Sequence, residues 1–423
     1  MPARIMGGMA ETNGGGANIP RAQWHTRISG VVFMWMAAAA VTAVFRDHIK
    51  DSTWLMVHFL LLGAVTNALF IWSWHFAGAI LRVPQADRAD EIMRLSVLNL
   101  GVAAVLIGAT TEAPVVAVIG VVFVGAAVVM HALAIRRAAQ RALPSPYAFT
   151  ADAYLLASSL LVLGIFLGGL MEAVAFDDAT KARVVLAHVS FNLLGWIGIP
   201  ILGTIVTLWP TMLRTRIAPN AAKLARRVLP VIGGATVAIA VAFAFDLTWL
   251  AAAGLVAYIV GFMVTLLPMV AVARNKRPAT FSTISAGLGM LWLVGTLVVF
   301  TIRVASAADA PALAAHSSTL VVSGAVGGVL QVLLGCLSYL LPAMAAGGPS
   351  IVRYRNDRAE RLLRPRLLFT EGGLLLWVVG LGNAMMALTL LGLVTSVIVI
   401  GSTLRTPSKE RAAAADAERG LPE

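Results

Sequence analysis

The chain has 423 residues, of which 59% are hydrophobic and only 12% are charged, and its mean hydropathy is +0.86. Ordinary soluble domains carry about 25% charged residues, so this composition excludes a soluble globular protein and predicts an all-α, polytopic membrane protein. The single cysteine, Cys336, excludes disulfides, haem attachment through CxxCH and thiolate-cluster metal sites.

Segments of about 20 apolar residues can cross a bilayer as helices. The sequence predicts twelve of them, at about 29–45, 53–81, 95–110, 113–135, 151–176, 184–213, 228–245, 248–273, 280–302, 311–346, 367–383 and 386–404. A polar tail, 1–28, precedes them and lacks the apolar core of a signal peptide. A charged tail, 405–423, follows them. The loop at about 347–366 carries six arginines and is predicted to be a surface hairpin, so we expect one membrane domain, 29–404.

The basic residues predict the orientation of these spans. Of the 32 Lys and Arg residues, 27 lie in the two tails and the even-numbered loops, and five lie in the odd-numbered loops. Basic loops remain in the cytoplasm. We therefore expect a multi-pass protein of the cell membrane with both termini in the cytoplasm. The net charge of +12 is explained by this bias and by the lipid bilayer as partner, and no nucleic-acid partner is predicted.

Three histidines recur at matching places. His58, His188 and His316 open the second, sixth and tenth spans, at intervals of 130 and 128 residues. Twelve spans then divide into three pseudo-repeats of four, at about 29–135, 151–273 and 280–404. Each histidine lies about five residues into its span, or roughly 7 Å below the outer interface. An ionisable residue within a span marks a functional site by default, so we predict one shared site.

Small residues accompany these histidines. Gly164 and Gly168 on the fifth span and Gly324 and Gly328 on the tenth are small-xxx-small pairs, which permit close helix packing and equally leave room for a flat cofactor. The other ionisable residues near the spans are interpreted as interfacial or capping groups: His25, His48, His75, His131, Asp152, Glu172 and Glu371.

Neutral imidazole is a ligand for haem iron, copper and zinc, and bundles hold such metals between facing helices. A proton relay, a transporter gate or hydrogen-bonded packing remain alternative roles for these histidines. No catalytic residue is predicted, because no nucleophile, carboxylate dyad or phosphate-binding glycine loop stands out.

Twelve helices with histidines on helices 2, 6 and 10 resemble the main subunit of the haem–copper oxidase superfamily. That resemblance implies haem ligation by His58 and His316 and copper ligation by His188. The chain departs from that family, because its seventh span has no histidine and Asn192 stands where the oxygen-reducing members carry a tyrosine. The oxygen- or nitric-oxide-reducing centre is therefore not carried over.

The sixth span, HxxxxxLGxxGxxxLG from His188 to Gly203, is similar to that of the NnrS family of haem- and copper-associated membrane proteins in nitric oxide metabolism. The segments HVSFNLLGWIGIPILGTIVTLWPTMLRTR and QVLLGCLSYLLPAMAAGGPS also resemble the membrane domain that some high-GC Gram-positive bacteria join to a copper oxidase or nitrite reductase. These resemblances imply a haem- or copper-binding protein of nitrogen-oxide or copper-linked redox metabolism. The alternatives are a non-catalytic membrane partner or assembly subunit of an extracytoplasmic copper oxidase or nitrite reductase, and a multi-pass transporter.

Overall fold

The computed structural model describes residues 21–83, 88–315, 318–344 and 349–405. Within these ranges every regular element is a helix. Eleven helices are long and apolar enough to cross a membrane. They coincide with all the predicted spans except 367–383, which confirms a multi-pass α-helical architecture.

The helices of the first half are α1 (Arg21–Ile28), α2 (Gly30–Val44), the 3-10 turn η1 (Arg46–His48), α3 (Ser52–Val57), η2 (His58–Val65), α4 (Thr66–Leu81), α5 (Arg88–Thr110), α6 (Pro114–Gln140), α7 (Phe149–Ala173), α8 (Asp178–Val189), η3 (Ser190–Gly198) and α9 (Ile199–Met212). Those of the second half are α10 (Ala221–Ala244), α11 (Thr248–Asn275), α12 (Phe281–Ser306), α13 (Ala310–Ala315), α14 (Ser318–Val322), η4 (Ser323–Leu330), α15 (Gln331–Met344), α16 (Pro349–Ala359), α17 (Leu363–Val378) and α18 (Ala384–Thr403).

Local sequence signals explain where several helices begin. Pro114 occupies the first turn of α6, where its missing N–H is not needed. The carboxylate of Asp177 accepts the backbone N–H of Thr180 and caps α8, and Thr280 forms a capping box with Thr283 at the start of α12. These residues end the polar loops and begin the apolar spans.

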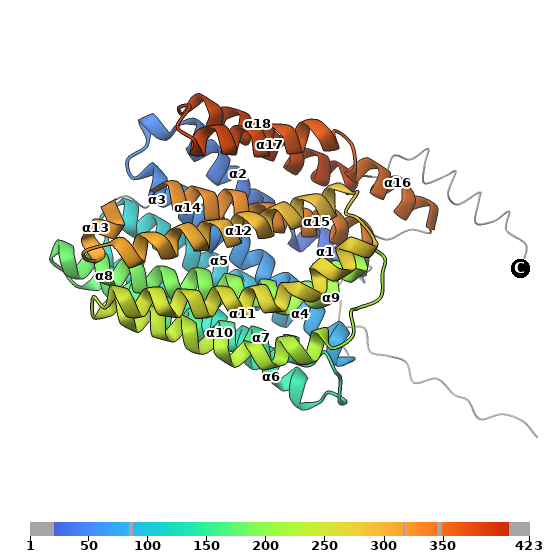
Figure 1. The fold of residues 1–423 in the computed structure, drawn as a ribbon, viewed down its shortest axis with the longest axis horizontal. Coiled ribbons are helices and arrows are strands. Elements are labelled where there is room, and N and C mark those ends of the chain that lie inside the picture. The colour runs from blue at the N-terminus through green and yellow to red at the C-terminus, as the bar shows by residue number, and fades with distance from the viewer. Residues whose placement is uncertain (1–20, 84–87, 316–317, 345–348, 406–423) are drawn as a thin grey trace, which may run out of the picture.

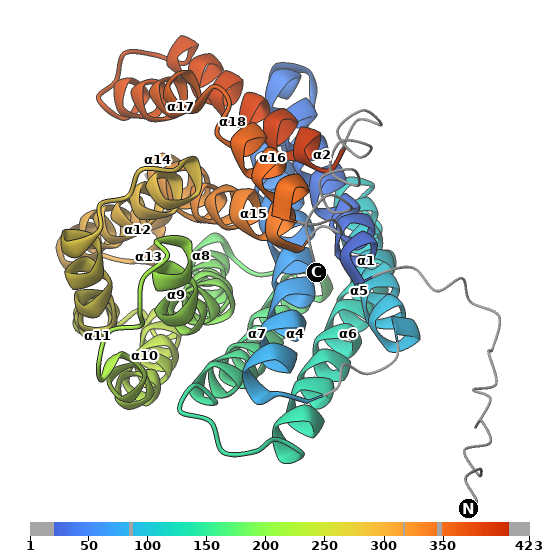
Figure 2. The ribbon, with the colours of Figure 1, turned by 90° about the vertical axis from the view of Figure 1, so that its right-hand side faces the viewer.

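The spans run side by side as one bundle, with α1 and α16 at one end and α8 and α13 at the other (Figure 1). Consecutive helices pack as antiparallel pairs, of which α5–α6, α10–α11 and α17–α18 make the largest contacts. Viewed from the end that carries α1 and α16, the helices α4, α9 and α15 surround the middle of the bundle (Figure 2).

The second, sixth and tenth spans share one construction. Each runs α–π–α: α3–η2–α4, α8–η3–α9 and α14–η4–α15, in which η2, η3 and η4 are π-helical. They are also the three most buried of the eleven spans. A π-helical turn is uncommon and is frequently found at functional sites. Three of them at matching places distinguish the helices that carry the predicted histidines.

Three sequence predictions are corrected by the structure. The arginine-rich loop at 347–366 contains the helix α16 rather than a hairpin, and its Arg355 and Arg366 are buried. Within the polar tail 1–28, α1 is helical and His25 is buried. The predicted span 367–383 is the 16-residue helix α17, which ends before Gly380 and Gly382, both at positive φ.

Candidate functional site

His58 is the first residue of η2. Its Nδ1 lies 2.8 Å from the backbone carbonyl oxygen of Trp54, one turn earlier, and the two rings stack with centroids 3.9 Å apart. A carbonyl only accepts, so Nδ1 carries the hydrogen and Nε2 has the lone pair. The backbone thus fixes both the tautomer and the orientation of this imidazole.

His188 lies near the end of α8 and is held by a different helix. Its Nδ1 is 2.8 Å from the carbonyl oxygen of Gly164 on α7. A Cβ added to Gly168 would lie 3.0 Å from the His188 ring, and one added to Gly164 would lie 2.7 Å from the Asn192 side chain. The small face of α7 therefore accommodates these side chains, and close packing, rather than a flat cofactor, explains the Gly164–Gly168 pair.

The two imidazoles come from different spans, which the Trp196–Thr66 hydrogen bond joins eight residues beyond each histidine. Both donate Nδ1–H to a backbone carbonyl, and no hydrogen bond to either Nε2 occurs within the described part of the chain. Metal-ligating histidines are commonly held in this way, with the second nitrogen left for the metal. His58 and His188 therefore suit a metal that accepts imidazole nitrogen.

The third predicted ligand, His316, lies outside the described residues. Among the described residues, no group of three or more His, Cys, Asp or Glu side chains is placed to hold a metal ion. The described residues thus place two of the three predicted histidines, on two spans that the Trp196–Thr66 hydrogen bond joins.

The π-helical segments are stabilised by side chains that bond their backbone oxygens. Asn67 donates to the Gly63 carbonyl, and Thr66 donates to that of Leu61. Trp196, 130 residues after Thr66, donates its Nε1–H to the Thr66 hydroxyl at 3.1 Å. These contacts join the second and sixth spans at positions separated by the repeat interval, just below the histidines.

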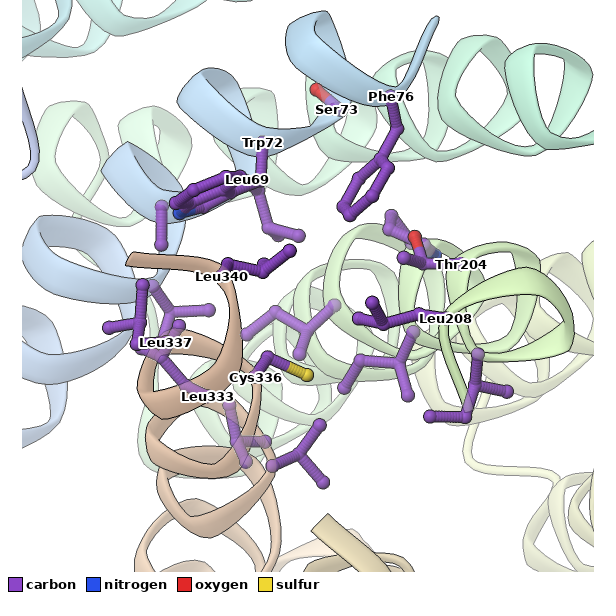
Figure 3. Close-up of a pocket in the computed structure, with 18 of the residues that line it drawn as sticks. Leu69, Trp72, Ser73, Phe76, Thr204, Leu208, Leu333, Cys336, Leu337 and Leu340 are labelled. Carbon is purple, nitrogen blue, oxygen red and sulfur yellow. The ribbon is translucent and has the colours of Figure 1, made fainter. Parts of the chain in front are cut away.

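An apolar cavity of about 90 Å³ lies between the three π-containing spans. It begins at Val65, Ile197 and Val329, at the inner ends of the π-helical segments, and extends away from the histidines. Figure 3 shows Leu69 and Trp72 of α4, Thr204 and Leu208 of α9, and Leu333, Cys336 and Leu340 of α15 around it. Sequence analysis did not predict this cavity, because it is formed by side chains from distant segments.

The polar groups at the cavity wall are already bonded to protein. The Tyr154 hydroxyl pairs with that of Thr204 at 2.7 Å, and the Ser73 hydroxyl pairs with His131 Nε2 at 2.8 Å. The interior is therefore almost wholly apolar. Such a cavity favours small apolar molecules over water.

Two of the histidines interpreted as interfacial are instead buried. His25 and His131 are 2% and 1% exposed. His25 stacks on Trp72 and contacts the edge of His75, with the two imidazole centroids 4.8 Å apart. His131 stacks on Phe70. This aromatic group borders the cavity at Trp72, and its formation could not be predicted without knowing that α1 packs into the bundle.

Together these features define a class: a multi-pass α-helical membrane protein whose three most buried spans carry π-helical segments, with a central apolar cavity between them and two histidines bonded to backbone carbonyls. The chain matches no model of a known protein family and no curated protein.

Proposed function

We propose that the protein is an integral membrane haem- and/or copper-binding protein of nitrogen-oxide or copper-linked redox metabolism. His58 and His316 are its haem-ligand candidates, and His188 is its copper-ligand candidate. Bound haem or copper would supply one-electron chemistry and a site for a diatomic gas. The histidines of this chain suit a metal centre with few protein ligands. They do not supply the three-histidine copper site of oxidases, because the predicted seventh span has no histidine.

The observation that carries this proposal is the matching arrangement of His58 and His188. They lie on two spans that the Trp196–Thr66 hydrogen bond joins eight residues beyond each histidine. In both histidines a backbone carbonyl binds Nδ1–H, which leaves the Nε2 lone pair for a metal. The α–π–α construction of all three spans supports placing His316 in the same layer.

The test is an absorption spectrum with metal analysis of the detergent-purified protein. We expect a haem Soret band or bound copper near stoichiometric level. His58→Ala and His316→Ala should remove or shift the haem band, and His188→Ala should lose copper. His48→Ala is the control, because His48 lies exposed in η1.

Size-exclusion profiles matched to the unaltered protein separate ligand loss from misfolding. Purified protein that contains neither haem nor copper, or that retains them in all three variants, contradicts the proposal.

The central cavity favours a second candidate, a transporter of small apolar solutes. A cavity between the innermost helices, away from the histidines, is a place where a solute could bind. In that case Cys336→Phe, which fills the cavity, should abolish solute flux in proteoliposomes, whereas His188→Ala should leave it unchanged. Flux that persists with the cavity filled argues against transport through this cavity.

A further inference from the structure

Glu371 lies at the depth of the middle of the neighbouring spans and not at a span end. It stands eight residues into α17, and its Oε2 accepts the indole Nε1–H of Trp292 at 2.8 Å. Trp292 is near the middle of the 26-residue helix α12. Gln331, which lies beside the carboxyl, is in the middle of the span Thr319–Met344. The sequence interpretation of Glu371 as a capping or interfacial group is therefore wrong.

The second oxygen of this carboxyl lies near the Gln331 side chain but makes no hydrogen bond of good geometry within the described residues. Glu371 Oε1 is buried, and so are both side-chain amide atoms of Gln331, and none of these three atoms makes a hydrogen bond of good geometry within the described residues. Gln331 is 1% exposed. Unsatisfied polar atoms in an apolar interior are costly, so their presence beside one another requires an explanation.

The surroundings offer no positive charge to this carboxyl. The neighbouring elements η4, α15 and α18 contain no Asp, Glu, Lys, Arg or His, and their only titratable side chains are Cys336 and Tyr339 of α15. The single charged residue of α12 is Arg303, near its far end. On α17 itself, Arg364 is exposed and Arg366 is bonded to Ser396 and to backbone carbonyls.

An ionised carboxylate would therefore have only neutral donors, Trp292 and the Gln331 amide, and no countercharge in the membrane interior, which costs several kcal/mol. Protonation removes this cost and also converts Oε1 from an acceptor to a donor. The acceptor it then needs is the side-chain oxygen of Gln331. One proton thus gives a hydrogen bond to both Glu371 Oε1 and the side-chain oxygen of Gln331.

We propose that Glu371 is an exchangeable proton-binding site in the middle of the membrane. Its Oε2 accepts the Trp292 indole hydrogen, and its Oε1 carries a proton donated to the Gln331 side-chain oxygen. The site joins α17 to α12 and to the start of α15, directly after η4. Binding of a proton at this site does not depend on the metal proposed at the histidines. A proton-binding carboxyl at this depth allows a proton-coupled step.

The test is infrared spectroscopy of the protein in lipid vesicles as the external pH is stepped from acidic to alkaline. We expect a protonated-carboxyl C=O band that diminishes as pH rises and is lost in Glu371→Gln. Glu91→Gln is the matched control, because Glu91 also accepts a tryptophan Nε1–H, from Trp24 at 2.7 Å, but has Arg88 and Arg94 nearby. That variant should retain the band.

Gln331→Leu distinguishes a proton site from a purely structural carboxyl. This variant keeps the acid but removes its acceptor, so the band should persist and move to higher frequency. A spectrum that is unchanged in Glu371→Gln overturns the proposal. A band that belongs to Glu371 but does not respond to external pH overturns the exchange.

A second measurement requires no variant. Dicyclohexylcarbodiimide reacts with protonated carboxyls in apolar surroundings, and peptide mass mapping should find an adduct on Glu371 whose yield falls at alkaline pH. An adduct yield on Glu371 that does not fall from acidic to alkaline pH contradicts the proposal.

Discussion

Gly168 sets the position of the His188 ring, because an added Cβ would lie 3.0 Å from Cε1 and 3.3 Å from Nδ1. Gly168→Ala should displace the imidazole by a few tenths of an ångström and lengthen its bond to the Gly164 carbonyl. Overpacking of this kind costs about 1–3 kcal/mol. We expect a lower midpoint of thermal unfolding in detergent and weaker metal binding at His188.

Gly125→Ala is the matched control for this prediction. A Cβ at Gly125 would meet only Ile165 Cγ2 at 3.9 Å, which is an ordinary contact. Equal effects of the two substitutions would show that the Gly168 result reflects helix propensity and not the histidine.

An exposed ion pair at the histidine-bearing end should make stability depend on pH. Lys50 Nζ lies 2.7 Å from Glu112 Oε1, joining the segment before α3 to the α5–α6 turn. The hydrogen bond to Lys50 lowers the pKa of the Glu112 carboxyl, and the hydrogen bond to Glu112 raises the pKa of the Lys50 ammonium.

The sign of the effect follows from these shifts. The Glu112 contribution is present above the ordinary glutamate pKa and is lost as pH falls through its lowered value. The Lys50 contribution is present below the ordinary lysine pKa and is lost as pH rises through its raised value. A double-mutant cycle with Lys50→Met and Glu112→Gln should therefore give a small coupling at neutral pH that vanishes in strong acid, in strong base and at high salt. A coupling that is insensitive to pH would contradict this.

At the scale of elements, Arg366 fixes the α17–α18 pair to the bundle. Its fully buried guanidinium lies 3.3 Å above the ring of Phe281 at the start of α12, and it donates to Ser396 of α18 and to the Ala359 carbonyl. Arg366→Met should leave these buried acceptors without a donor and lower the free energy of unfolding by about 3 kcal/mol.

The readouts for Arg366→Met are the unfolding midpoint and trypsin cleavage at the remaining arginines of 349–364, which should become faster. Arg364→Met is the control, because Arg364 is exposed two residues away. If both variants resist trypsin equally, Arg366 does not hold this region in place.

The spans were largely predictable from the sequence, because apolar runs of this length have few other stable structures in a membrane. The π-helical segments were not predictable, since His58–Val65 and Ser190–Gly198 have the sequence of ordinary apolar helix and their wider turns are bonded by side chains such as Asn67. Likewise, the burial of His25 depends on where α1 packs. The apolar run 367–383 also predicted a longer helix than the structure has, because the turn at Gly380 and Gly382 ends α17 at Val378.

At the scale of the candidate site, the 130-residue interval between His58 and His188 recurs between Thr66 and Trp196, whose hydrogen bond joins the two spans. This interval could not identify the carbonyl that orients His188, because Gly164 is on another helix, 24 residues earlier. Nor could it place Glu371, whose position relative to Trp292 depends on how α17 packs against α12. Pairings between helices are set by side-chain fit and not by the pattern of any one helix.

For the whole molecule, the distribution of Lys and Arg predicts the orientation, and the single cysteine makes it testable. Cys336→Ser provides a background free of cysteine. In that background Asp178→Cys, at the start of α8, should react with a membrane-impermeant maleimide on intact cells. Lys276→Cys, directly after α11, should react only after the cells are opened.

Both positions are exposed, so reactivity reports the side of the membrane and not burial. The opposite pattern of labelling would place the histidine layer at the cytoplasmic side. It would also remove the basis for an extracytoplasmic partner enzyme.

The shortness of α17 has a consequence for the surrounding lipid. Sixteen residues span about 24 Å at 1.5 Å per residue, whereas the hydrocarbon layer of a typical bilayer is about 30 Å thick. A helix that crosses the bilayer with this mismatch draws the two leaflets together or gathers longer neighbours around it. We expect acyl chains beside α17 to be compressed, so that headgroups and their hydration approach Glu371 more closely there than elsewhere on the perimeter.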